Sequence, residues 1–183
     1  MTRLVIGALL AAVVMFVWGF FFWTVLPQRF SVMRPLPDGD EVAATLKKGL
    51  PESGVYLWPF GDCSEMEELS RRHEEGPLVQ ITYRKDGVKM MNPAVFAAGF
   101  GHFFLSALLA ALLLQFALPN LPSYFCRVGF VALLGLFAGL FIDLSTPIWF
   151  HHPVGFPLYN FAYHATSWLL AGLALGAVVK PRD

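Results

Sequence analysis

The chain has 183 residues, of which 56% are hydrophobic and only 14% are charged. A soluble domain carries about 25% charged residues, so this composition, with a mean hydropathy of +0.58, excludes an ordinary soluble enzyme and a disordered chain. The formal net charge is zero, which leaves no basic surface for nucleic acid. We therefore expect the lipid bilayer to be the main partner of this chain.

Four long apolar runs predict four transmembrane helices. A helix needs about 20 apolar residues to cross a hydrocarbon core about 30 Å thick, and in lipid each span must satisfy its own backbone hydrogen bonds. The fold class is therefore mainly α: an antiparallel four-helix transmembrane bundle. The first run is longer than the apolar region of a signal peptide and lacks a cleavage site, so we expect an uncleaved anchor. The predicted spans are residues 4–26, 93–118, 124–144 and 157–179.

The residues between the first two spans, 28–92, predict a small extramembrane α+β insert. They hold every acidic residue except Asp143 and Asp183. Asp38 and Asp40 precede a helix over 41–48 as N-capping residues. Further along, the pattern predicts a strand over 54–59, a helix over 63–75, a strand over 78–84 and, after an Asp86-Gly87 hairpin turn, a return strand over 88–91. A unit of this size buries little and is marginally stable alone.

The basic residues of the short connections predict the orientation. Arg3, Arg127, Lys180 and Arg182 fall on one side, and the opposite short loop, 145–156, contains no Lys or Arg. By the positive-inside rule, both termini are cytoplasmic and residues 28–92 are periplasmic in a multi-pass protein of a bacterial inner membrane. Basic residues that flank the spans on the other side, such as Arg29 and Lys89, count less because long segments translocate largely regardless of charge.

Small residues at helical spacing predict how the spans pack. Gly135 and Gly139 form such a pair in the third span, and Gly172 and Gly176 form one in the fourth. Small residues allow close approach of helices in lipid. His102 falls on a small-residue stripe of the second span and His164 on the glycine stripe of the fourth, so we expect the two imidazoles to face inward.

The two histidines lie at similar depths below the same surface. His102 follows Pro93 by nine residues and His164 follows Pro157 by seven, which places them roughly 10–14 Å deep at 1.5 Å per residue. Two level, inward imidazoles on different helices are candidate axial ligands of haem b or of another transition metal. The alternative is structural hydrogen bonding to Ser106, Ser167 or Asp143. Covalent c-type haem is excluded because the chain has no Cys-x-x-Cys-His motif.

Asp143 is the only acidic residue within a predicted span. An ionisable group at membrane depth is costly and is a candidate functional residue with a partner, here His164, His102 or Asn160. Alternatively, the carboxylate reaches water or bonds Ser145 and Thr146. The adjacent His151 and His152 could hold copper or zinc with Asp143 as a hard ligand, or could belong to an aromatic loop at the membrane interface.

The two cysteines and an acidic cluster in the insert are also considered as candidate sites. Cys63 and Cys126 fall on opposite membrane sides, so we expect no disulfide between them. The acidic residues of 62–68 with His73 form either a weak cation site or a solvated helix face paired with Arg71 and Arg72.

No hydrolase elbow, phosphate-binding loop, zinc-protease motif or dinucleotide fingerprint is present. The sequence therefore favours a non-catalytic accessory, scaffold or sensing subunit that works with another membrane protein or as a homo-oligomer. One alternative is a bis-histidine haem b protein of electron transfer that uses His102 and His164. Another is a proton-coupled transporter component that uses Asp143, although four spans without an internal repeat are few for a transporter.

Three stretches carry a resemblance to known proteins. They are Val17-Trp18-Gly19 with Trp23 and Leu26-Pro27, then the run 51–56, and then the run 127–135. With the four-span layout, they resemble a group of uncharacterised bacterial inner-membrane proteins of similar length. The resemblance implies the same architecture and, because that group has no assigned activity, it implies no catalytic residue.

Overall fold

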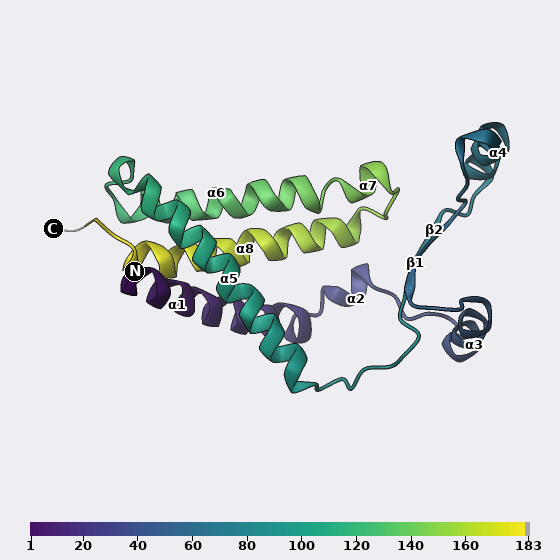
Figure 1. Cartoon of the computed structure of the whole chain (residues 1–183), viewed down its shortest axis with the longest axis horizontal. Coiled ribbons are helices and arrows are strands. Elements are labelled where there is room, and N and C mark those ends of the chain that lie inside the picture. The colour runs from purple at the N-terminus through teal and green to yellow at the C-terminus, as the bar shows by residue number, and fades with distance from the viewer. Residues whose placement is uncertain (182–183) are drawn as a thin grey trace. The chain divides into compact units, whose positions relative to one another are not determined.

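The computed structural model describes residues 1–181, with the backbone alone at Cys63. The chain forms two units (Figure 1). The first, called here the helical unit, joins Met1–Arg34 to Asn92–Asp183, and the second, the insert, is Pro35–Met91.

The helical unit contains four helices that are long and apolar enough to cross a membrane. This confirms the predicted mainly helical class. The first helix, α1, continues into a π-helical turn, η1, and the third is followed by a single turn, α7. The bounds are α1 Thr2–Phe20, η1 Phe21–Val25, α5 Pro93–Ala117, α6 Tyr124–Ile142, α7 Thr146–Trp149 and α8 Gly155–Val178.

Side-chain caps fix where two of these helices begin. The Asn92 side chain accepts a hydrogen bond from the Ala94 amide at 3.0 Å, directly before Pro93 at the first turn of α5. The Ser123 hydroxyl accepts one from the Cys126 amide at 3.1 Å at the start of α6. Such caps satisfy amides that a helix leaves without an internal partner.

The long helices pack mainly through α1 and α8. Helix α8 packs against α6 and α1, and α1 also packs against α5, whereas α5 and α6 contact each other little. In Figure 1, α5 meets α6 near their short connection and diverges from it toward Pro93. Alanines dominate the core between α1, α5 and α8: Ala8, Ala11, Ala107, Ala111 and Ala171. Small core residues bring helix backbones close together, as expected where burial of apolar surface does not drive association.

Helices α6 and α8 approach each other closely at two glycines. Gly135 on α6 lies against Trp168, and a Cβ at this position would overlap the indole side chain. On α8, a Cβ at Gly172 would lie 2.9 Å from the Val128 carbonyl oxygen. One glycine of each predicted packing pair therefore lies where another helix leaves no room for a side chain.

The outward surface of the helical unit is as apolar as its core. Large side chains on α5 and α6 point away from the other helices, among them Leu105, Phe116, Phe125, Phe137 and Phe141, which are 61–79% exposed. A helix that is apolar on all sides is typical of a membrane span.

A buried arginine joins the ends of three helices. Arg127 on α6 is 7% exposed, and its Nε donates a hydrogen bond to the carbonyl of Gly176 in the last turn of α8 at 3.0 Å. A terminal nitrogen donates to the carbonyls of Leu121 and Pro122, in the connection between α5 and α6, at 3.4 and 3.2 Å. A cation at a helix C-terminus is also favoured by the helix dipole.

The insert is a two-stranded antiparallel sheet with flanking helices. Strands β1, Gly54–Trp58, and β2, Val79–Tyr83, pair with Tyr56 opposite Ile81. None of the insert side chains that the structure describes is buried, which is consistent with a unit of marginal stability. The helices are α3 Gly39–Gly49, η2 Cys63–Glu65 and α4 Met66–Glu75, and the one-turn α2, Arg29–Val32, precedes the insert.

Two sequence predictions for the insert are wrong. Residues 88–91 form no strand after Asp86-Gly87, because β2 pairs with β1 instead. The Lys85 amide donates to the Ser53 hydroxyl at 3.0 Å, which closes this pairing. Asp38 precedes α3 but does not cap it with its side chain, because its backbone is left-handed at φ 48°. Its carbonyl instead accepts the Val42 amide at 3.0 Å.

Cys126 is free and exposed. The Cys63 side chain lies outside the described part of the structure, so the predicted absence of a disulfide between the two stays a prediction.

Replacement of Arg127 by Met should destabilise the helical unit. The change leaves the carbonyls of Gly176, Leu121 and Pro122 without their donor. A hydrogen bond from a charged group contributes about 1.5–3 kcal/mol to stability. We expect the free energy of unfolding in detergent to fall by about 2 kcal/mol, as measured by denaturant titration. Arg3→Met is the control, because Arg3 is exposed and should change stability by less than about 0.5 kcal/mol. Equal stability of the two variants would contradict this role of Arg127.

Candidate functional site

The candidate site is centred on Asp143, at the C-terminal end of α6. Its amide donates to the Gly139 carbonyl at 2.8 Å, which places the carboxylate at the negative end of the helix dipole, an unfavourable position for an anion. Asp143 is nevertheless only 6% exposed. A buried carboxylate in such a position requires a close partner.

That partner is His164 on α8. Its Nδ1 lies 2.6 Å from Oδ2 of Asp143, so the first of the three predicted partners is the observed one. Ser145 and Thr146, the alternative partners, donate to backbone carbonyls instead of to the Asp143 carboxylate. The Thr146 hydroxyl donates to the backbone carbonyl of Asp143 at 2.9 Å, and the Ser145 hydroxyl donates to the backbone carbonyl of Ile142. The histidine side chain is 41% exposed. With Nδ1 engaged by Asp143, Nε2 is the ring nitrogen left for a ligand.

His164 lines a cavity of about 330 Å³ within the helical unit. This volume is at the lower end of the size range of ligand pockets. All four long helices contribute to its wall. The polar lining residues are His102, Ser106, Tyr163, His164 and Ser167. Apolar and small residues form the remainder, including Met15, Phe103, Gly135, Ile142 and Trp168.

Both histidines predicted to face inward line this cavity. His102 lines it from α5, is exposed, and contacts the Phe103 ring at a centroid distance of 5.6 Å. Ser167 also lines the cavity, and its buried hydroxyl has Tyr163 as its polar neighbour. The site therefore offers an imidazole nitrogen and a serine hydroxyl to an occupant, while the role of His102 and His164 as metal ligands stays a prediction.

An aromatic cluster that sequence reasoning missed holds α1 against α8 beside this cavity. The Tyr159 hydroxyl donates to the Phe22 carbonyl in the π-helical turn at 3.0 Å, and the Trp18 indole donates to the Thr166 hydroxyl at 3.0 Å. Tyr163, which lines the cavity, packs on Phe22 at a ring distance of 5.2 Å. A π-helical turn is rare and frequently marks a functional site. The only signal in the sequence was the run of aromatic residues at 20–23.

The loop after α7 brings no metal cluster together. His152 packs against Phe150 at a ring distance of 6.1 Å, and His151 adopts a left-handed backbone. Within residues 1–181, no three His, Cys, Asp or Glu side chains are grouped closely enough to hold a metal ion. The predicted set of His151, His152 and Asp143 therefore gains no support, and Asp143 is engaged by His164.

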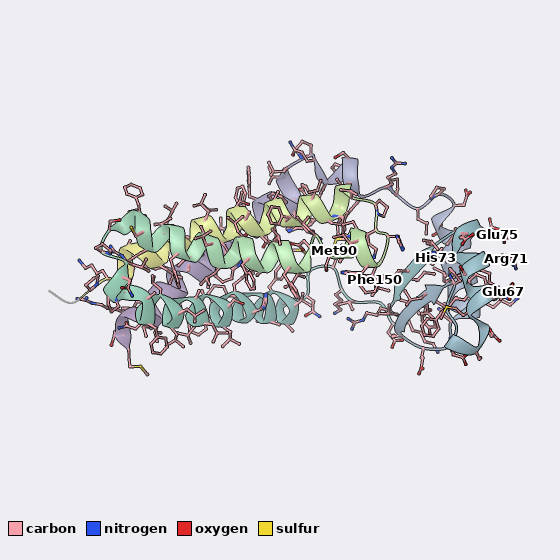
Figure 2. The ribbon with its side chains drawn as sticks, turned by 90° about the horizontal axis from the view of Figure 1, so that it is seen from above. Glu67, Arg71, His73, Glu75, Met90 and Phe150 are labelled. Atoms are coloured by element: carbon pink, nitrogen blue, oxygen red, sulfur yellow. The ribbon has the colours of Figure 1, made fainter. Side chains whose placement is uncertain are left out.

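Two acidic residues of α4, Glu68 and Glu75, are paired with arginines of the same helix. Glu68 lies 2.7 Å from Arg71 and 2.6 Å from Arg72, and Arg71 also contacts Glu75 at 2.7 Å. Figure 2 shows Arg71 and Glu75 together on this helix. Hydrogen bonds from Arg71 and Arg72 lower the pKa of the Glu68 carboxyl to about 2. Among the acidic residues of 62–68, the pairing with Arg71 and Arg72 predicted from the sequence is present at Glu68.

Comparison with known proteins gives no relative for this site. No family model matches the chain, and neither a curated protein nor a solved structure matches it.

Acid should weaken α4 over a defined pH range. Because the pKa of Glu68 falls from 4.5 to about 2 in the folded chain, its contribution to stability is complete above pH 4.5 and is lost as the pH falls through about 2. We expect the hydrogen-exchange protection of α4 amides in the full-length protein to decrease across this range.

The matched variant is Arg71→Ala/Arg72→Ala, which removes both donors to Glu68. Without these donors the pKa of Glu68 should be the same in the folded and the unfolded chain, so the variant should lack this pH-dependent loss of protection. Because these groups are exposed, high salt should shrink the difference between the two proteins. An identical pH profile in the variant would contradict the assigned cause.

Proposed function

We propose that this chain is a multi-pass membrane protein with an antiparallel four-helix transmembrane bundle, and that it is a non-catalytic accessory or sensing subunit. It binds a small ligand in the cavity beside Asp143 and His164, and it works with another membrane protein or a second copy of itself. The observation that carries this proposal is the buried carboxylate paired to an imidazole that opens onto a cavity of ligand size. An ionisable pair kept within an apolar helical unit is costly and is therefore typical of a functional site.

The membrane location is supported by the character of the four helices. Their most apolar segments have mean hydropathies of 2.6, 2.0, 2.2 and 1.3. Short connections after α5 and α6 reverse the chain direction (Figure 1). The outward apolar side chains on α5 and α6 are best accommodated by lipid or by another apolar helix.

Basic groups at one end of the helical unit support the proposed orientation. Arg3 and Lys180 line a shared depression with Gln115 near the end of α5, and Arg127 lies at the start of α6. By the positive-inside rule this end faces the cytoplasm of a bacterial inner membrane, and the insert is periplasmic.

Cysteine labelling tests the orientation. In a Cys63→Ser background, Cys126 is exposed at the proposed cytoplasmic end, and Lys48→Cys places an exposed thiol in the insert. A membrane-impermeant maleimide added to spheroplasts should label position 48 at once, and Cys126 only after the membrane is permeabilised. The reverse order would place the insert in the cytoplasm.

Analysis of co-purified small molecules tests ligand binding. Protein purified in lipid nanodiscs should retain a small molecule, measurable by mass spectrometry of an extract, and Asp143→Asn should reduce its amount at least about tenfold, a change of about 1.4 kcal/mol. Gln115→Leu is the control, because Gln115 lies at the opposite end of the unit. Equal small-molecule content in wild type and Asp143→Asn would contradict the proposal.

Haem b is a second candidate ligand, because His102 and His164 line the same cavity. A metal-ligating histidine commonly has its other ring nitrogen bound to a carboxylate, as Nδ1 of His164 is bound to Asp143. Protein from a haem-replete host should then show an absorption band near about 410–430 nm, as expected for a low-spin haem. The band should be lost in His102→Ala. A colourless wild-type protein would overturn this candidate.

A further inference from the structure

We infer that the cavity beside Asp143 and His164 takes the head group of a lipid-soluble quinone, which enters sideways from the bilayer between α5 and α6. This inference rests on the proposed function and names the ligand class of the same site. Four features carry it: the open side of the helical unit, the depth of the polar groups, the charge of the lining and its aromatic walls.

The open side lies between α5 and α6. These two helices are each fixed to another helix, α5 to α1 and α6 to α8, and they contact each other little. The cavity nevertheless has walls from both, with His102 on α5 and Ile142 on α6. A Cβ added at Gly99 or Gly101, on the same part of α5 as His102, would meet no atom within 4 Å. The cavity is therefore open toward the space that lipid fills.

In the proposed transmembrane arrangement, the polar groups lie well below the membrane surface. His102 follows the first residue of α5 by nine positions, and His164 follows the first residue of α8 by nine. At 1.5 Å per residue this is a depth of about 14 Å in a hydrocarbon core of about 30 Å. A ligand that reaches this depth through a lateral opening is soluble in lipid.

The charges of the lining favour a neutral head group. No Lys or Arg lines the cavity, and the Asp143 carboxylate lies behind His164, so a phosphate or carboxylate would find no fixed cation to pair with. Nε2 of His164 accepts a hydrogen bond when the ring is neutral and donates one when it is protonated. The hydroxyls of Ser106 and Ser167 donate as well as accept. This set suits carbonyl oxygens and the phenolic hydroxyls of the reduced form.

The walls favour a flat ring. Phe103 on α5 and Trp168 on α8 line the cavity, with Gly135 and Gly139 on α6. Aromatic faces stack on planar ligands, and Trp168 is held in place by its packing against Gly135. The volume of about 330 Å³ admits a ring with its substituents but leaves a long tail outside, in lipid.

Tryptophan fluorescence of the full-length protein in nanodiscs tests the inference, with decylubiquinone as the probe. Because quinones quench indole fluorescence at short range, binding beside Trp168 should give saturable quenching. Trp168→Phe should reduce the amplitude and leave the dissociation constant within about twofold. Asp143→Asn and Ser167→Ala should each raise the dissociation constant, the first by at least about tenfold. Gln115→Leu should match wild type, and a thermal melt verifies that each variant is folded.

Two further probes separate the possible failures. Decylbenzene has the same tail without carbonyls, so equal competition by decylbenzene would overturn the role of the carbonyl groups. If haemin binds and decylubiquinone does not, the quinone inference fails while ligand binding at this site stands. If quenching is non-saturable and identical in all variants and haemin does not bind, the inference and the proposed function both fail.

Discussion

The close approach of α6 and α8 is the constraint on which the rest of the structure depends. It requires glycine at position 135, where the Trp168 side chain occupies the space of a Cβ, and at position 172, which faces the Val128 carbonyl. This contact brings the end of α6 against the middle of α8, so that Asp143 meets His164 at 2.6 Å. Larger side chains at these positions would separate the helices and leave a carboxylate buried without a partner, which is far more costly than the loss of packing alone.

The sequence contains strong signals for the helices and weaker ones for their contacts. Apolar runs longer than a bilayer requires identify four helices because no soluble fold needs such segments. Asp143 stood out as a candidate for the same reason, since a carboxylate within an apolar run is costly anywhere. The choice of His164 over His102 as its partner depends on helix rotation and tilt, which a single sequence does not fix.

Other features depend on tertiary contacts that no local pattern encodes. Arg127 resembled an ordinary cytoplasmic flanking charge, yet it binds the Gly176 carbonyl and the connection after α5. The Asp86-Gly87 signal is not followed by a return strand, and β2 pairs with β1, which precedes α4 in the chain. The open side between α5 and α6 also escaped prediction, because the small residues of α5 predicted close packing on all helices alike.

The one-sided attachment of α5 has a mechanical consequence. This helix is held along α1 and barely touches α6, whereas α1, α8 and α6 form a continuous row of contacts. Parts of a protein with few buried contacts move at the lowest free-energy cost. A swing of α5 about its connection to α6 would change the space between these two helices, whereas the Asp143–His164 hydrogen bond joins α6 to α8 and would stay intact.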